Sequence, residues 1–137
     1  MPAPLLRALI VWLLIMAAES LLGGLRRLIV PEALAFAARE VSALVSVAMI
    51  FAISWTTASW LRLRSGGQAL AVGLAWAALT LGFEIGLGRL MGASWAWILA
   101  DYDLRNGGLM PVGLLLMALT PWAVLRLRGE AARRPLR

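Results

Sequence analysis

Residues 65–83 read SGGQALAVGLAWAALTLGF, a run without a single charged side chain that ends directly before Glu84. Near the start of the chain, residues 8–18 read ALIVWLLIMAA and end in the same way, directly before Glu19. An α-helix needs about 20 predominantly apolar residues to cross the ~30 Å hydrocarbon core of a bilayer. Lipid cannot hydrogen-bond to an open strand edge, so these runs are predicted to be membrane-spanning helices.

Four runs of this kind divide the chain. They predict an all-α integral membrane protein, a four-helix bundle that forms one transmembrane domain over residues 1–137. Each predicted span is close to the length that a single crossing requires. The spans cover approximately residues 5–25, 41–61, 69–88 and 108–125.

The composition supports this class of protein. Hydrophobic residues make up 62% of the chain and charged residues 15%, whereas soluble domains have about 45–50% and about 25%. The net charge is +6, and all 13 basic residues are arginines near the ends of the apolar runs. Such arginines are placed to meet lipid headgroups, and no soluble domain remains to bind nucleic acid. Because the chain has no cysteine and no histidine, disulfides, thiolate metal sites and histidine chemistry are excluded.

The connections differ in character. Residues 62–68, RLRSGGQ, are short and predict that the second and third spans form a hairpin. Short interfacial helices are predicted in the first connection, at residues 31–40, and in the third, at residues 95–105. Pro31 suits the first turn of a helix, and that helix can run straight into the second span. Ser94 suits the N-cap of the other, which Asn106-Gly107-Gly108 would end.

The arginines also indicate an orientation. Cytoplasmic loops of membrane proteins carry the excess of basic residues. The termini and the 62–68 turn share one side with eight arginines, and the other two connections have five. We therefore expect a multi-pass cell-membrane protein with both termini in the cytoplasm. The eight are Arg7, Arg62, Arg64, Arg126, Arg128, Arg133, Arg134 and Arg137, and the five are Arg26, Arg27, Arg39, Arg89 and Arg105.

A weak internal repeat is visible. Glu19-x-x-x-Gly23 matches Glu84-x-x-x-Gly88 at an offset of 65, and the sequence LRLR occurs at residues 61–64 and 125–128. One interpretation is a tandem repeat of a two-helix unit, residues 1–64 and 65–128. The other is chance, since leucine and arginine are common in this chain.

Glu19 and Glu84 are the main functional candidates, because a carboxylate at membrane depth costs about 2–4 kcal/mol and is by default a sign of function. Both are predicted past the midplane, nearer the two longer connections. One hypothesis is a pair that responds to protons or cations. The alternative is a structural ion network that orients the helices, or carboxylates close enough to the interface to reach water.

Four arginines are candidate charge partners of these glutamates, or parts of an anion site. The alternative is that they anchor the helices at the interface with snorkelling side chains. They are Arg26, Arg27, Arg39 and Arg89.

Three further groups of residues are candidates. Asp101 and Asp103 could form a polar or cation site, although on a helix they would not face each other. Ala78, Gly82 and Gly86 recur every four residues and predict a face for close packing, within the bundle or between protomers. In the second span, Ser46, Ser54 and Thr57 share one side, as a polar path or as hydrogen-bonding groups. Trp12, Trp55 and Trp76 are predicted to pack in the core, with an aromatic-lined pocket as the alternative.

Three functions remain open from the sequence. The first is a small ion- or proton-coupled transporter or channel that uses Glu19 and Glu84, working as a homo-oligomer. The second is a non-catalytic membrane subunit or assembly factor that docks a larger partner protein. The third is a small lipid-acting enzyme that uses Asp101, Asp103 and arginines. No phosphate loop, nucleophile motif or metal-ligand spacing occurs, so an enzyme is disfavoured and no cofactor or metal is expected.

Overall fold

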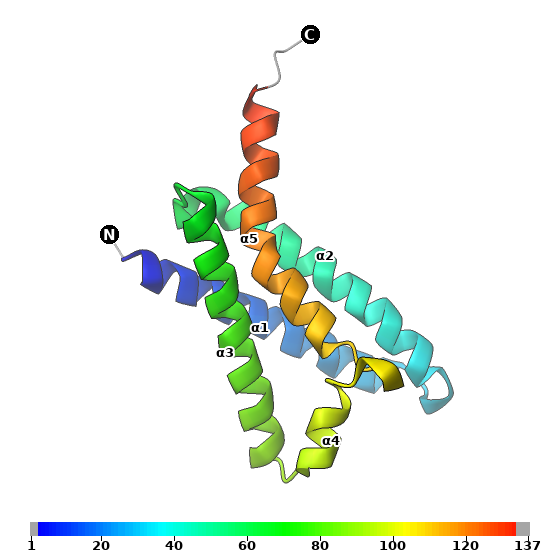
Figure 1. Ribbon diagram of the computed structural model, residues 1–137. Helices are drawn as coiled ribbons and strands as arrows, with labels where there is room; N and C mark the ends of the chain where they lie inside the picture. Colours follow the sequence, from blue (N-terminus) through cyan, green and yellow to red (C-terminus); the bar gives the residue numbers. More distant parts are fainter. Residues whose placement is uncertain (1–2, 134–137) are drawn as a thin grey trace.

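The computed structural model describes residues 3–133 and contains only helices and their connections over that range. Four of the helices are long and apolar enough to cross a membrane. The predicted all-α fold with four long helices is therefore confirmed. Arg134 and Arg137, two of the eight arginines used to predict the orientation, lie outside the described residues. The elements are α1 (Pro4–Ile29), η1 (Glu32–Leu34), α2 (Ala35–Leu61), α3 (Gly66–Leu90), α4 (Trp95–Ala100), η2 (Leu104–Asn106) and α5 (Met110–Arg133) (Figure 1).

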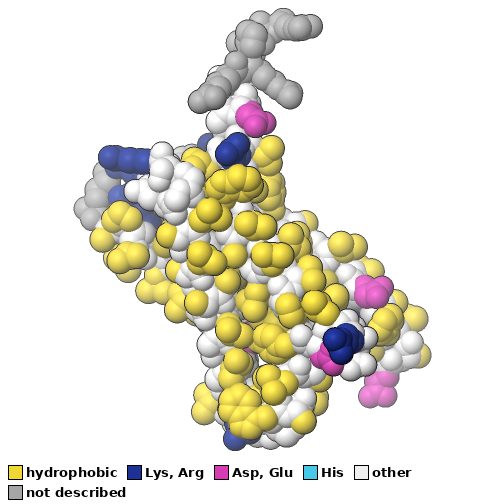
Figure 2. Space-filling model, viewed as in Figure 1, with side chains coloured by type: hydrophobic (Ala, Val, Ile, Leu, Met, Phe, Trp, Pro, Cys, Tyr) yellow, Lys and Arg dark blue, Asp and Glu magenta, His cyan; other side chains and the backbone are white. Residues whose placement is uncertain are grey.

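The surface of the bundle is apolar along its sides. Figure 2 shows hydrophobic side chains over most of the visible face, with charged side chains gathered toward its ends. Large side chains such as Leu5, Leu28 and Leu90 are 83%, 85% and 88% exposed. A monomer in water rarely exposes so much contiguous apolar surface. The surface therefore fits a bilayer, in which lipid tails cover these helices.

The helices pack in an order that differs from the chain order. Helices α2 and α3 are joined by a tight turn, in which Arg62 has a positive φ of 53° and the Ser65 hydroxyl accepts from the Gln68 amide. The predicted hairpin is thus present as a connection. However, α5 packs against both α2 and α3 and lies between them, while α1 packs on α2 and more briefly on α3 (Figure 1).

Two tryptophans join α1 to α3 in the core. The Trp12 Nε1–H donates to the Thr80 hydroxyl at 3.0 Å, and the Trp76 Nε1–H donates to the Ala8 carbonyl at 2.8 Å. Both rings are buried, as predicted. The prediction is wrong for Trp55, whose ring is 37% exposed and stacks on Phe51. Trp55 lies on the outer side of α2, which apolar spacing alone does not distinguish from the inner side.

The closest helix contact is between α3 and α5. A Cβ added at Gly73 would lie 1.9 Å from the carbonyl oxygen of Ala118. Only glycine permits this approach, because the two backbones meet at the position that any other side chain would occupy.

The small residues singled out in the sequence occupy a different face. Ala78, Gly82 and Gly86 are exposed, and no atom lies within 4 Å of a Cβ built at either glycine. They make no close packing face among the described residues of the protomer, which leaves the prediction of contact between protomers.

The two longer connections match the prediction to different degrees. Residues 31–40 form the short η1 turn and then continue directly into α2, which is one of the two arrangements expected for them. In the third connection, the Ser94 hydroxyl caps α4 by accepting from the Trp97 amide, but the helix ends at Ala100 rather than near residue 105. The reason is local, because the Asp103 carboxylate accepts from the Arg105 amide and starts the η2 turn instead.

The tandem repeat stays a prediction. Glu19 and Glu84 do occupy comparable places, in the second halves of α1 and α3. The two LRLR segments do not, since residues 61–64 end α2 and enter the turn, whereas residues 125–128 lie inside α5.

Candidate functional site

Glu19 lies between α1 and α2 with one of its two oxygens held. The Ser46 hydroxyl of α2 donates to Glu19 Oε2 at 2.7 Å. The other oxygen, Oε1, is buried and has no hydrogen-bond partner within residues 3–133. A buried polar atom without a partner is costly and marks a place where a proton, an ion or a water molecule would be stabilised.

Glu84 of α3 faces the same region. Its carboxylate interacts electrostatically with Asp101, Glu19 and Arg27, so α1, α3 and the third connection converge on it. The residue is exposed at the surface of the protomer, unlike Glu19, which is half-buried. The two glutamates thus interact electrostatically, but Glu84 is exposed at the surface of the protomer and Glu19 is only half-buried between helices.

Tyr102, in the third connection, lies close enough to Glu84 and Asp101 to interact with them electrostatically. Burial, and then the negative charges of Glu84 and Asp101, raise the pKa of the Tyr102 phenol above its usual value. Its hydroxyl is buried and finds no hydrogen-bond partner in the described chain. The phenol is therefore protonated near neutral pH and has an O–H donor to offer to its surroundings.

Arg39 pairs with Asp101 rather than with either glutamate. The pair ties α2 to the third connection, and the two side chains are 42% and 54% exposed. An ion pair this open to solvent contributes about 1 kcal/mol or less. Its main effect is on the site, because it fixes Asp101 beside Glu84. We refer to these residues as the carboxylate cluster, comprising Glu19, Glu84, Asp101, Ser46, Tyr102, Arg27 and Arg39.

Two of the four predicted arginine partners lie outside the cluster. Arg89 donates to the Ala93 carbonyl at 3.0 Å and its guanidinium lies 5.0 Å from the Trp95 ring centre, so it organises the end of α3. Arg26 lies in the last turn of α1 and makes no ion pair within the part of the chain that the structure describes. Arg27 stays close to Glu84 without a direct contact.

Asp101 and Asp103 do not act together. Asp101 belongs to the carboxylate cluster, whereas Asp103 accepts hydrogen bonds from the Arg105 amide at 3.0 Å and the Asn106 side chain at 2.6 Å. Asp103 is therefore a turn residue. Over residues 3–133, no three carboxylates come close enough together to hold a metal ion.

No protein-family model, curated protein or solved structure matches this chain.

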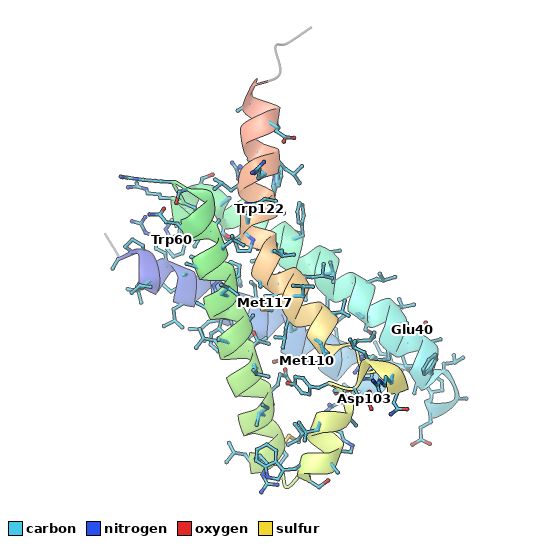
Figure 3. All side chains as sticks on the ribbon, viewed as in Figure 1. Glu40, Trp60, Asp103, Met110, Met117 and Trp122 are labelled. Atoms are coloured by element: carbon cyan, nitrogen blue, oxygen red, sulfur yellow. The ribbon has the colours of Figure 1, made fainter. Side chains whose placement is uncertain are left out.

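Sequence reasoning missed two arginines at the opposite end of the bundle. Buried Arg7 of α1 reaches the Trp60 carbonyl at 3.4 Å, and Arg128 of α5 reaches the Trp55 carbonyl at 2.6 Å. Figure 3 places Trp60 and Trp122 at this end, far from Glu40 and Asp103, with Met117 between the two ends. The available signal was that both arginines interrupt or end apolar runs. For Arg7 a physical reason is also clear, because the Trp60 carbonyl is among the last of α2 and such carbonyls attract cations.

Proposed function

We propose that this protein moves protons or small cations across the membrane, as a small transporter or channel with Glu19 and Glu84 as its ion-responsive groups. The observation that carries the proposal is Oε1 of Glu19, which is buried and has no hydrogen-bond partner among the described residues, while Ser46 donates to the other oxygen. A structural ion network would pair both oxygens with donors. A binding group must instead keep one oxygen available, and ionisable groups inside membranes commonly mark ion or proton pathways.

The three carboxylates of the cluster could accept a proton or cation in turn, from the surface of the protein toward its interior. Asp101 is exposed, Glu84 interacts with Asp101, and Glu19 interacts with Glu84. Past Glu19, the core closes around Trp12, Trp76 and Thr80. We propose that the rest of the path runs between two copies of the chain, which meet through the open Ala78, Gly82 and Gly86 face of α3.

The proposal predicts a loss of ion flux from two single substitutions. Glu19→Gln and Glu84→Gln keep the size of the side chain and remove its charge, so each is expected to lower flux at least ten-fold in liposomes that report internal pH or cation content. Glu40→Gln, on the exposed side of α2 at the same end of the bundle, is the matched control and should leave flux unchanged. Wild-type liposomes that carry no proton, sodium or potassium flux would overturn the proposal.

The direction of insertion is also a proposal. Four spans, an even number, would put the start of α1 and the end of α5 on one side of the membrane, and the eight-to-five distribution of arginines favours the cytoplasm for that side. The carboxylate cluster would then open toward the outside of the cell.

A second function is favoured by the same open face of α3. Close-packing residues that meet nothing in the protomer also suit a non-catalytic subunit that docks a larger membrane protein. In that case the protein would purify with one stoichiometric partner and would show no flux alone. Nothing in the geometry favours a lipid-acting enzyme, since Asp101 is paired with Arg39 and Asp103 with its own turn.

A further inference from the structure

A second polar site lies at the other end of the bundle, between the C-terminal half of α2 and α5. There the helices line a half-open cavity of about 250 Å³. Its walls are mainly apolar and include Ala58, Leu61, Pro121 and Val124. The residues of the carboxylate cluster do not contribute to it, so it needs an explanation of its own.

The cavity is lined by a buried hydroxyl, that of Ser54, for which the described residues provide no hydrogen-bond partner. Ser54 is 1% exposed and lines the cavity, and its Oγ makes no hydrogen bond within residues 3–133. Serine and threonine hydroxyls in membrane helices usually bond to a carbonyl one turn earlier, as Thr57 does with the Ile53 carbonyl at 2.6 Å. Ser54 does not, so its O–H is available to a group inside the cavity.

An arginine lies at the edge of the same cavity and is held in position by α2. Arg128 donates from Nη1 to the Trp55 carbonyl at 2.6 Å and from Nη2 to the Ser59 hydroxyl at 3.1 Å, with its guanidinium 5.6 Å from the Trp55 ring centre. A guanidinium has five N–H donors. No carboxylate pairs with Arg128 among the described residues. The remaining donors and the full positive charge are therefore free for an anion.

We infer that this cavity binds a phospholipid with an anionic headgroup. Its phosphate would accept hydrogen bonds from Arg128, and an ester carbonyl would accept from the Ser54 hydroxyl. The first part of an acyl chain would fill the apolar space between α2 and α5. Guanidinium groups bind phosphate through several charge-assisted hydrogen bonds. A lipid fits better than free phosphate, because phosphate alone would leave the apolar walls and the deeper Ser54 hydroxyl uncovered.

Native mass spectrometry of protein extracted from vesicles of phosphatidylcholine and phosphatidylglycerol tests this inference. The wild-type chain should retain one phosphatidylglycerol in preference to phosphatidylcholine. Arg128→Gln should weaken that retention about ten-fold, since it removes a charged hydrogen-bond donor. Ser54→Leu and Ala58→Leu should weaken it as well, because each fills the cavity and leaves Arg128 in place. Two filling variants are used so that either one that folds, as judged by its helical circular dichroism, gives the answer.

The matched control is Arg126→Gln. Arg126 is two residues away, outside the walls of this cavity, with its guanidinium 5.0 Å from the Trp122 ring centre. It should bind phosphatidylglycerol as the wild type does. Equal losses in the Arg126 and Arg128 variants would mean diffuse attraction to anionic lipid and would overturn the inference. Full retention by the folded cavity-filling variants, or displacement of the lipid by inorganic phosphate, would overturn it too.

Discussion

Replacing Gly73 with alanine is expected to separate α3 from α5 and to destabilise the protein by about 3 kcal/mol or more. The new methyl group would lie 1.9 Å from the Ala118 carbonyl oxygen, which is backbone and cannot rotate away. Overpacking in a close-packed interior usually costs about 1–3 kcal/mol, and a clash with backbone belongs at the top of that range or above it. The measurement is unfolding in detergent, followed by circular dichroism.

Gly113→Ala is the matched control for this prediction. Gly113 lies on α5, the other helix of this contact, and a Cβ there meets no atom of the described residues within 4 Å. Alanine should therefore be neutral or stabilising by about 0.5–1 kcal/mol, the usual difference between the two residues inside a helix. If both alanine variants unfold alike, the described contact between α3 and α5 is wrong.

Trp76→Ala should have the second large effect, a loss of about 3 kcal/mol. Trp76 is fully buried, and truncating a buried tryptophan costs about 3–5 kcal/mol in soluble proteins. The lower end is expected here, because in lipid the loss comes from packing and a hydrogen bond rather than from exposure to water. The same unfolding measurement applies.

Two further variants separate the causes of that effect. Trp76→Phe keeps most of the ring and removes the hydrogen bond to the Ala8 carbonyl, so it should cost only about 1 kcal/mol. Trp97→Ala, at a residue that is 65% exposed, should change stability by less than about 0.5 kcal/mol. A cost for Trp97→Ala equal to that of Trp76→Ala would show that truncating any tryptophan destabilises the protein, regardless of burial.

The sequence predicted the number of helices well, because spanning a bilayer is a requirement on length and charge along the chain. For example, α3 ends at Leu90, directly after the charged Arg89 and shortly before Gly92, which has a positive φ. Packing between the helices could not be predicted in the same way. Helices that are apolar all round have no polar face to orient them, so the position of α5 between α2 and α3 left no signal in the pattern of residues.

The small residues of α3 illustrate this limit. Gly73 and Gly82 lie on one helix in similar small-residue patterns, yet a Cβ at Gly73 meets α5 and a Cβ at Gly82 meets no atom of residues 3–133 within 4 Å. Only the position of the neighbouring helix distinguishes them. Trp55 was misplaced for the same reason.

The candidate site was partly accessible from the sequence. The cost of a carboxylate at membrane depth singled out Glu19 and Glu84, and the side of α2 that contains Ser46 was recognised as polar. The pairing of Arg39 with Asp101 was not predicted. It depends on how two connections far apart in the chain meet in space, and no spacing within either connection encodes that meeting.

The central claim is that Glu19 and Glu84 lie close enough within one chain to interact electrostatically. The chain contains no cysteine, so pairs of cysteines can be introduced and cross-linked in native membranes with a short bifunctional thiol reagent. The claim predicts an efficient link within the monomer for Glu19→Cys combined with Glu84→Cys. It predicts no such link for Glu19→Cys combined with Gly82→Cys, on the opposite side of α3. Equal linking of the two pairs, or links found only between separate chains, would contradict it.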